Sequence, residues 1–224
     1  MGHFSMEKSV PTGSTLNGNQ HRHCSKHKSA YRRHGDPVQR GVTKAELAEY
    51  RELVSRRMQQ NPDSPVWPGC EANWLAMADH AHAVLEGFLS GRPGFRHERI
   101  AAQETARLAI AVEASKVAET ILAMFIMLEL QPSRFRSDRA FRAQMVRRVR
   151  GLTDLNVGRW ADSKSGRTKL AYSELPPKAT AVMGLWLAKA IGGVGVHLGR
   201  MERSQLEQDQ QRRETLRAAL AELH

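Results

Sequence analysis

The sequence predicts a mainly α-helical protein, a helical bundle that carries one β-hairpin. Three observations support this fold class. Apolar residues recur at helical spacing over most of the chain, glycine and proline fall mostly between these periodic segments, and one short stretch, 157–172, has the pattern of two strands joined by a turn. With 224 residues, of which 41% are hydrophobic and 25% charged, the chain suffices for one globular domain with a tail.

Three helices are predicted in the first half of the chain. Residues 1–20 are polar and without periodicity, which predicts a flexible leader, and 21–42 form a short basic segment rich in histidine. Thr43-Lys-Ala-Glu46 is a capping box that begins a helix, and three prolines beyond residue 61 end it. Further helices are expected at 71–90 and 97–130, and the second is the candidate for the central core helix because it is strongly periodic and rich in alanine.

The second half of the chain contains the hairpin between further helices. A helix from Ser137 to Gly151 precedes strands at about 157–162 and 168–172, and Pro176-Pro177 begin a helix that reaches about Ile191. Gly192-Gly-Val-Gly195 then predicts a flexible break. The expected organisation is a leader at 1–20, a basic His/Cys segment at 21–42, a helical domain at 43–199 and a charged C-terminal helix at 200–224.

The cysteine content and the hydropathy pattern indicate a cytoplasmic protein. Two cysteines cannot form a disulfide framework, which favours a reducing compartment. Residues 1–19 lack the apolar core of a signal peptide. The longest apolar stretch, 108–130, carries four charged residues, too many for a bilayer span. We therefore expect no membrane partner.

The net charge of +11 is concentrated in two blocks. Residues 1–42 hold seven Lys and Arg against two Asp and Glu, and residues 131–178 hold twelve against four. The segment between them, 43–130, is mildly acidic. A charge that served solubility alone would be spread evenly, whereas concentration into patches is typical of proteins that bind a polyanion.

The arginine-rich segment 134–150 predicts a helix with a cationic outer face. Phe141, Met145 and Val149 fall on one side and are expected to pack inward, which leaves arginines on the other sides. Such a helix fits the major groove or lies along a phosphate backbone, and Gln144 and Arg147 are side chains of the kind that reach base edges.

The hairpin that follows gives the region 108–172 the order helix–helix–hairpin, as in winged-helix DNA-binding proteins, a likeness of fold alone. Cations at the tip of the hairpin are placed where a wing contacts phosphates. Together with two arginines of the N-terminal segment, the predicted nucleic-acid contacts are Arg136, Arg139, Arg142, Arg147, Arg148, Arg150, Lys164, Arg167, Lys169, Arg32 and Arg33.

The N-terminal basic segment also contains residues that bind metals. Cys24 and His27 have Cys-x2-His spacing, which places a thiolate and an imidazole on one zinc ion. Tetrahedral zinc takes four ligands, and His21 and His23 are the candidates for the other two, with His34 as a further one.

The residues Cys24, His27, Tyr31, Arg32, Arg33, Gly35, Asp36 and Pro37 resemble, in order, the second half of a small zinc-binding module. That module occurs in proteins of phages and other mobile elements, often beside HNH-type nuclease domains. The resemblance covers about 15 of the 224 residues, and the Cys pair of the first half of the module is absent. It implies zinc as a cofactor, whereas nuclease activity is not implied because no His-Asn-His constellation is present.

The leading functional hypothesis is a non-enzymatic protein that binds nucleic acid. No phosphate-binding or nucleophile motif of the common kinds occurs. Double-stranded DNA is favoured over RNA because no aromatic stacking platform is visible. We expect an accessory or regulatory protein of a phage or other bacterial mobile element, associated with the nucleoid if it binds DNA. The alternatives are a helical subunit of a ribonucleoprotein or anti-defence assembly, docking through 201–223, and a cryptic nuclease.

Overall fold

The computed structural model describes residues 24–161 and 168–222, and this part of the chain is mainly α-helical. The helices are joined by short turns, and the two strands form one antiparallel hairpin. The elements are α1 (Ser25–His34), α2 (Lys44–Gln60), α3 (Val66–Leu89), α4 (Arg96–Ala111), α5 (Ala114–Leu130), a 3-10 turn (Pro132–Arg134), α6 (Asp138–Arg150), β1 (Val157–Ala161), β2 (Thr168–Tyr172) and α7 (Pro177–Glu222).

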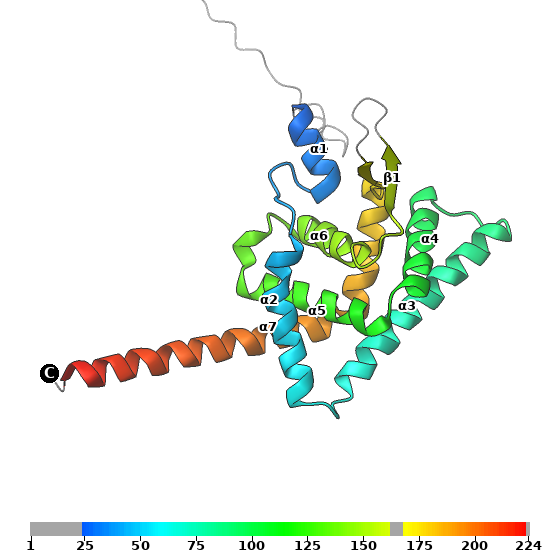
Figure 1. The fold of residues 1–224 in the computed structure, drawn as a ribbon. Coiled ribbons are helices and arrows are strands. Elements are labelled where there is room, and N and C mark those ends of the chain that lie inside the picture. The colour runs from blue at the N-terminus through cyan, green and yellow to red at the C-terminus, as the bar shows by residue number, and fades with distance from the viewer. Residues whose placement is uncertain (1–23, 162–167, 223–224) are drawn as a thin grey trace, which may run out of the picture.

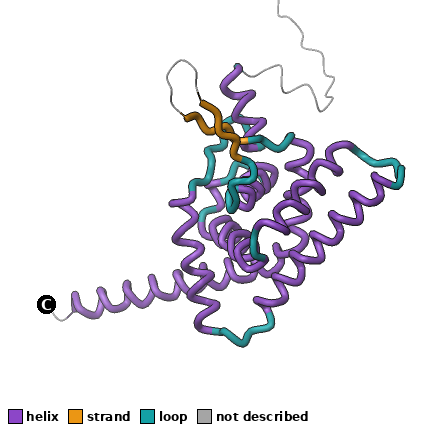
Figure 2. The backbone as a smooth tube through the Cα atoms, turned by 45° about the vertical axis from the view of Figure 1, so that its right-hand side comes forward, coloured by secondary structure: helices purple, strands orange, loops and turns teal. Residues whose placement is uncertain are grey.

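Helix α5 forms the centre of the bundle, as predicted for this part of the chain. Every residue from Ile121 to Met127 is buried, and α2, α3, α6 and α7 all pack against this helix. Helices α3 and α4 form an antiparallel pair on one side of the bundle, and α1 and the hairpin lie together at one end of it (Figures 1 and 2).

The prediction of one helix over 97–130 is wrong, because the chain turns between α4 and α5. Val112 is extended, with φ −134° and ψ 132°, and the carbonyl of Glu113 accepts the first backbone hydrogen bonds of α5. A straight helix of that length would extend about 50 Å. The turn allows α4 to pack on α3 while α5 enters the core, so tertiary packing sets this boundary.

Helix α3 begins at Val66, five residues before the predicted start, and includes Pro68. Proline is tolerated in the first helical turn because the backbone N–H that it lacks has no partner there. The preceding turn is held by Trp67, whose indole N–H donates to the carbonyl of Asn61 at 2.8 Å.

The predicted flexible break at Gly192–Gly195 is also wrong, because α7 is one continuous helix of 46 residues. Gly192 and Gly195 lie against the ring of Phe125 on α5, and Gly199 lies against Glu129. A Cβ at Gly195 would stand 2.6 Å from the Cβ of Phe125. These glycines let two helix backbones approach closely, which is a packing role and not a hinge.

Two ion pairs hold the last packed turns of α7. Glu202 binds Arg57 of α2 at 2.6 Å, and Arg203 binds Glu129 of α5 at 2.8 Å. Beyond Gln205 the side chains are almost all exposed, and the helix runs away from the body (Figure 1). The predicted separate helix at 200–224 is therefore, as far as residue 222, the continuation of α7, and its part beyond Gln205 projects from the body.

Helix α7 is, within the described residues, the one helix long and apolar enough to cross a membrane by length and composition. Its apolar residues Met183, Leu187 and Ile191 are fully buried among the other helices. Of the apolar window of α7, 39% is buried inside the protein.

The predicted hairpin is present, with Val157 paired to Tyr172 and Ala161 paired to Thr168. Lys164 and Arg167, predicted at its tip, lie outside the described residues, and Lys169 is described by its backbone pairing with Trp160.

Candidate nucleic-acid interface

Helix α1, which the sequence did not predict, places the N-terminal basic segment against α6. It ends at Gly35, whose φ of 79° is left-handed and whose N–H donates to the carbonyl of Tyr31 at 3.0 Å. A side chain at Gly35 would stand 3.0 Å from the carbonyl oxygen of Arg139. The Asp36 carboxylate then accepts the N–H of Val38 at 2.9 Å, which completes the turn that follows α1.

Three side-chain contacts seat α1 on its neighbours. The guanidinium of Arg139 lies 4.7 Å from the ring centre of Tyr31, within the range of a cation–π interaction. His34 Nδ1 is 3.0 Å from the amide nitrogen of Gln144. Arg33 pairs with Glu174, which follows β2. The two basic blocks of the sequence therefore meet beside the hairpin (Figure 1).

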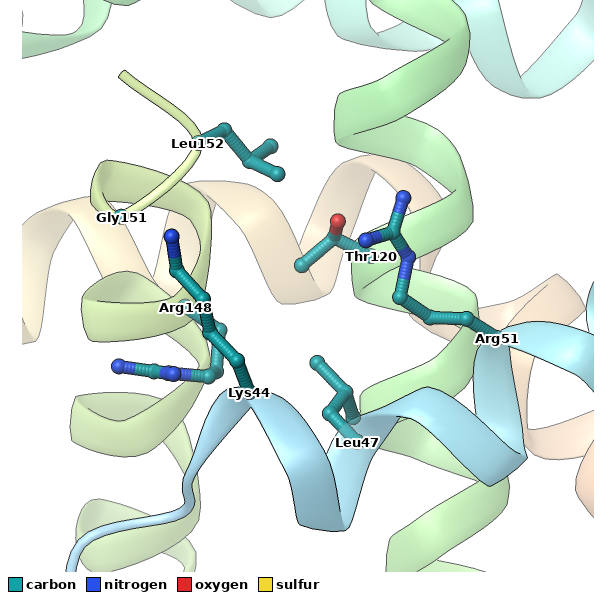
Figure 3. A pocket seen from close by; sticks show the side chains of 7 residues that line it. All are labelled: Lys44, Leu47, Arg51, Thr120, Arg148, Gly151 and Leu152. Carbon is teal, nitrogen blue, oxygen red and sulfur yellow. The ribbon is translucent and has the colours of Figure 1, made fainter. Parts of the chain in front are cut away.

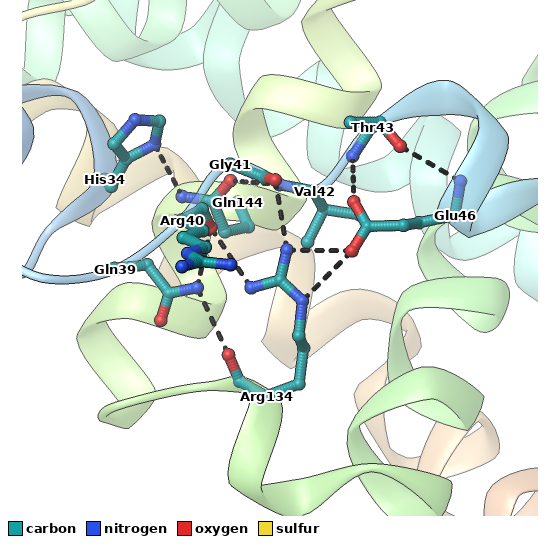
Figure 4. A network of polar contacts seen from close by, with 9 residues as sticks. All are labelled: His34, Gln39, Arg40, Gly41, Val42, Thr43, Glu46, Arg134 and Gln144. Atoms are coloured by element: carbon teal, nitrogen blue, oxygen red, sulfur yellow. Dashed lines mark hydrogen bonds and ion pairs between the residues drawn. The ribbon is translucent and has the colours of Figure 1, made fainter.

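A polar network fixes the linker between α1 and α2 to α6 and the turn before it (Figure 4). The side-chain oxygen of Gln144 accepts the N–H of Val42 at 3.0 Å, and that of Gln39 accepts the N–H of Arg136 at 3.0 Å. Arg134 donates to Glu46 and to the carbonyl of Gly41, each at 3.0 Å. The linker is therefore clamped along its length.

The expectation that Gln144 reaches base edges is wrong. Its side chain is 0% exposed and is occupied by Val42 and His34. A buried amide needs hydrogen-bond partners, and the network supplies them. The helical spacing from Phe141 and Met145 already places position 144 toward the inner face of α6.

A second polar cluster fixes the base of the hairpin. Glu104 of α4 is buried and accepts hydrogen bonds from Arg150 at 2.6 Å and from Asn156 at 2.8 Å. Arg150 also donates to the carbonyl of Ser173, so one arginine joins α4, α6 and the end of β2. Arg150, predicted as a nucleic-acid contact, is thus bound internally and only 11% exposed.

The other predicted contact residues differ in how far they are accessible. Arg32, Arg136 and Arg139 are exposed, Arg142 is half-buried, and Arg33 is exposed but paired with Glu174. Arg147 and Arg148 are half-buried, and the Nε atom of each has no hydrogen-bond partner within the described part of the protein. Burial lowers the pKa of both guanidinium groups. Their charge is therefore poorly compensated by the protein itself.

The environment of α6 limits the likeness to a winged helix. The order of α5, α6 and the hairpin is as predicted, but most of the α6 surface is covered by α1, α5 and α7. Seven of its 13 residues are buried. A helix enclosed in this way cannot insert along its length into the major groove, so its exposed arginines are suited to phosphates.

Histidine 34 is the titratable group that joins α1 to α6. Burial and the neighbouring charge of Arg147 lower the pKa of His34 below its usual value, with Arg33 and Arg134 acting in the same direction and Glu174 against them. The imidazole is therefore neutral at pH 7, and its Nδ1 accepts a hydrogen bond from Gln144.

Of the four predicted zinc ligands, two lie side by side. Cys24 Sγ is 3.1 Å from His27 Nδ1 on the first turn of α1, whereas His21 and His23 fall outside the described residues. Among the residues that are described, no group of three metal-ligating side chains converges. Zinc binding stays a prediction.

Sequence reasoning missed the residues that position this surface, namely Gln39, Glu104 and Arg134. Their roles depend on partners 46 to 97 residues away, so no local motif indicates them.

Comparison of the chain with protein-family models, with curated proteins and with solved structures finds no match.

Proposed function

We propose that this protein binds nucleic acid, with duplex DNA the favoured form, through the surface that α1 and α6 form together. The observation that carries the proposal is the balance of charge on this side of the molecule. The carboxylates of Glu46, Glu104 and Glu174 are each bound by an arginine. Five arginines of this surface have no ion pair within the described residues: Arg32, Arg136, Arg139, Arg142 and Arg147.

The acidic side chains near this surface are too few to neutralise it. Asp138 and Asp154 are exposed and Asp36 is half-buried, and these three carboxylates oppose five arginines that have no carboxylate partner in the described chain. A surplus of positive charge attracts a polyanion, and the counterions of the polyanion are released when it binds. The contacts proposed are with the phosphate backbone, because the covered α6 excludes deep groove insertion. Binding is therefore expected to depend weakly on sequence and strongly on salt.

The test is fluorescence anisotropy with random duplex DNA, single-stranded DNA and structured RNA over a range of salt concentrations. The variant Arg32→Ala/Arg136→Ala removes two exposed cations, and Arg56→Ala/Arg99→Ala removes two exposed cations on α2 and α4 as a matched control. We expect the first variant to reduce the slope of log K against log salt by about 2, and the control to leave it unchanged. Equal slopes for both variants would contradict the proposal.

A role as an accessory protein of a phage or mobile element follows from the local resemblance at residues 24–37 and belongs to this proposal. Metal analysis of untagged protein tests the zinc that the resemblance implies. Less than about 0.2 zinc per chain would exclude a stoichiometric site.

A second candidate function, as a subunit that docks on another protein or a ribonucleoprotein, is favoured by the free end of α7. Leu206, Leu216 and Leu220 are exposed on this unsupported helix. Binding of a partner by the full chain and its loss on truncation after Gln205 would support this function over the first. Cleavage of DNA with Mg²⁺ or Mn²⁺ would instead indicate the cryptic nuclease.

A further inference from the structure

A pocket separate from the α1–α6 surface lies between α2, α5 and the C-terminal end of α6. Its volume is about 180 Å³. Lys44 and Arg51 come from α2, Thr120 from α5 and Arg148 from α6, while Leu47 and Leu152 supply apolar wall (Figure 3). Three cationic side chains from two helices thus line one small concavity.

Within the described part of the chain, only Arg51 of these three cations is paired with a carboxylate. Arg51 forms two hydrogen bonds with the carboxylate of Glu119, at 3.1 and 3.0 Å. Lys44 is exposed and has no ion pair within the described residues. The carboxylate that acts electrostatically on Arg148 is that of Glu46. This carboxylate is already bound by Arg134 and by the N–H of Thr43. The pocket therefore carries a surplus of positive charge.

Arg148 is the residue whose environment most requires a further partner. Its Nε–H is buried, and no acceptor for it is found in the described part of the chain. Buried polar groups in folded proteins are nearly always hydrogen-bonded, and an unpaired one is costly, more so when it is charged. Because the Nε atom itself has almost no accessible area, a bound oxyanion would balance the charge of the guanidinium through its terminal nitrogens.

The size of the pocket limits what this anion is. Pockets for drug-sized ligands are typically about 300–1,000 Å³, so 180 Å³ is too small for a whole nucleotide. It accommodates one tetrahedral oxyanion. Arginine and lysine are the usual protein partners of phosphate.

We propose that this pocket binds a phosphate group, with Lys44 and Arg148 as its charged partners and Arg51 held in place by Glu119 as part of the wall. The group is either inorganic phosphate or one phosphate of a nucleic-acid backbone. Arg148 lines this pocket together with residues of α2 and α5, whereas Arg147, which belongs to the surface proposed above, does not line it. The pocket therefore does not depend on the surface proposed above.

The experiment is a calorimetric titration of the full chain with inorganic phosphate at constant ionic strength, with chloride as the reference anion. The variants are Lys44→Met and Arg148→Met, which keep an apolar stem, and Arg56→Met is the control of equal charge change on the exposed side of α2. We expect saturable binding by the wild type, weakened about tenfold or more by each pocket variant and unchanged in the control.

Absence of saturable phosphate binding by the wild type, or equal affinity in all three variants, would overturn the proposal. Lys44 is exposed, so Lys44→Met tests the pocket even if Arg148→Met disturbs the fold. Anisotropy with duplex DNA then identifies the source of the phosphate. DNA affinity unchanged in Arg148→Met indicates inorganic phosphate, and a parallel loss with competition by free phosphate indicates the DNA backbone. If the chain does not bind DNA, the calorimetric result still stands alone.

Discussion

Replacing Gly195 with alanine should destabilise the protein, whereas the same replacement at Gly193, two residues earlier, should stabilise it. Both glycines lie inside α7, so both variants gain the helix propensity of alanine, about 0.5–1 kcal/mol. At Gly193 nothing lies within 4 Å of the added Cβ. At Gly195 it would stand 2.6 Å from the Cβ and 2.7 Å from the Cγ of Phe125.

The contact at Gly195 cannot be relieved by a change of rotamer, because the Cβ of Phe125 is fixed to the backbone of α5. Helix α7 must therefore shift away from α5, and overpacking of this kind costs about 1–3 kcal/mol. After the gain in propensity, the net loss at Gly195 is about 1 kcal/mol and at most about 2.5 kcal/mol. Gly193→Ala should be more stable than the wild type by about 0.5–1 kcal/mol.

Urea unfolding followed by far-ultraviolet circular dichroism measures both changes as shifts of the midpoint at constant slope. Shifts of the same sign and size for the two variants would refute the packing of α7 on Phe125. A loss of stability in Gly193→Ala would refute the continuity of the helix, since alanine is favoured over glycine in a helix and not in a flexible break.

Further predictions concern the clusters that position the surface. Glu104→Gln should cost about 2–4 kcal/mol because it leaves Arg150 charged and 11% exposed without its carboxylate, and the double variant with Arg150→Met should recover much of the loss, as urea unfolding would show. His34 has a lowered pKa in the folded protein, so its contribution to stability is complete above about pH 6.5 and is lost as the pH falls through the folded pKa. His34→Asn should therefore flatten the pH dependence of unfolding below pH 6.5, and an unchanged profile would count against the contact with Gln144. Truncation after Gln205 should leave the urea midpoint unchanged because the removed side chains are almost all exposed, and a lower midpoint would show that they support the core.

The parts of the fold that local chemistry determines could be predicted from the sequence. Thr43 caps α2 by accepting the N–H of Glu46 at 3.0 Å, and Ser137 caps α6 by accepting the N–H of Ala140 at 3.1 Å. The alternation and turn of the hairpin were equally local. The turn at Val112 contains neither glycine nor proline, so only the packing of α4 and α5 on different neighbours determines it.

The glycines of α7 and the arginines of α6 show a different limit. Glycine both breaks helices and lets them approach closely, and only the position of Phe125 decides between these roles at Gly195. The positive charge of the surface could be predicted from the sequence. Which arginines form internal ion pairs, and are therefore not available to a ligand, could not. Glu104 lies 46 residues before Arg150 in the chain, and a pairing over that separation has no signature in sequence.

The continuity of α7 gives its free end a fixed length and rotational phase relative to the core. An α-helix turns by about 100° per residue, so inserting one residue after Gln205 would rotate the exposed leucines by about a quarter of a circle. Inserting seven would return them nearly to their first direction, about 10 Å farther out. A partner that binds this end in one fixed orientation should bind the two insertion variants with different affinities. A partner joined through a flexible linker should bind both variants equally.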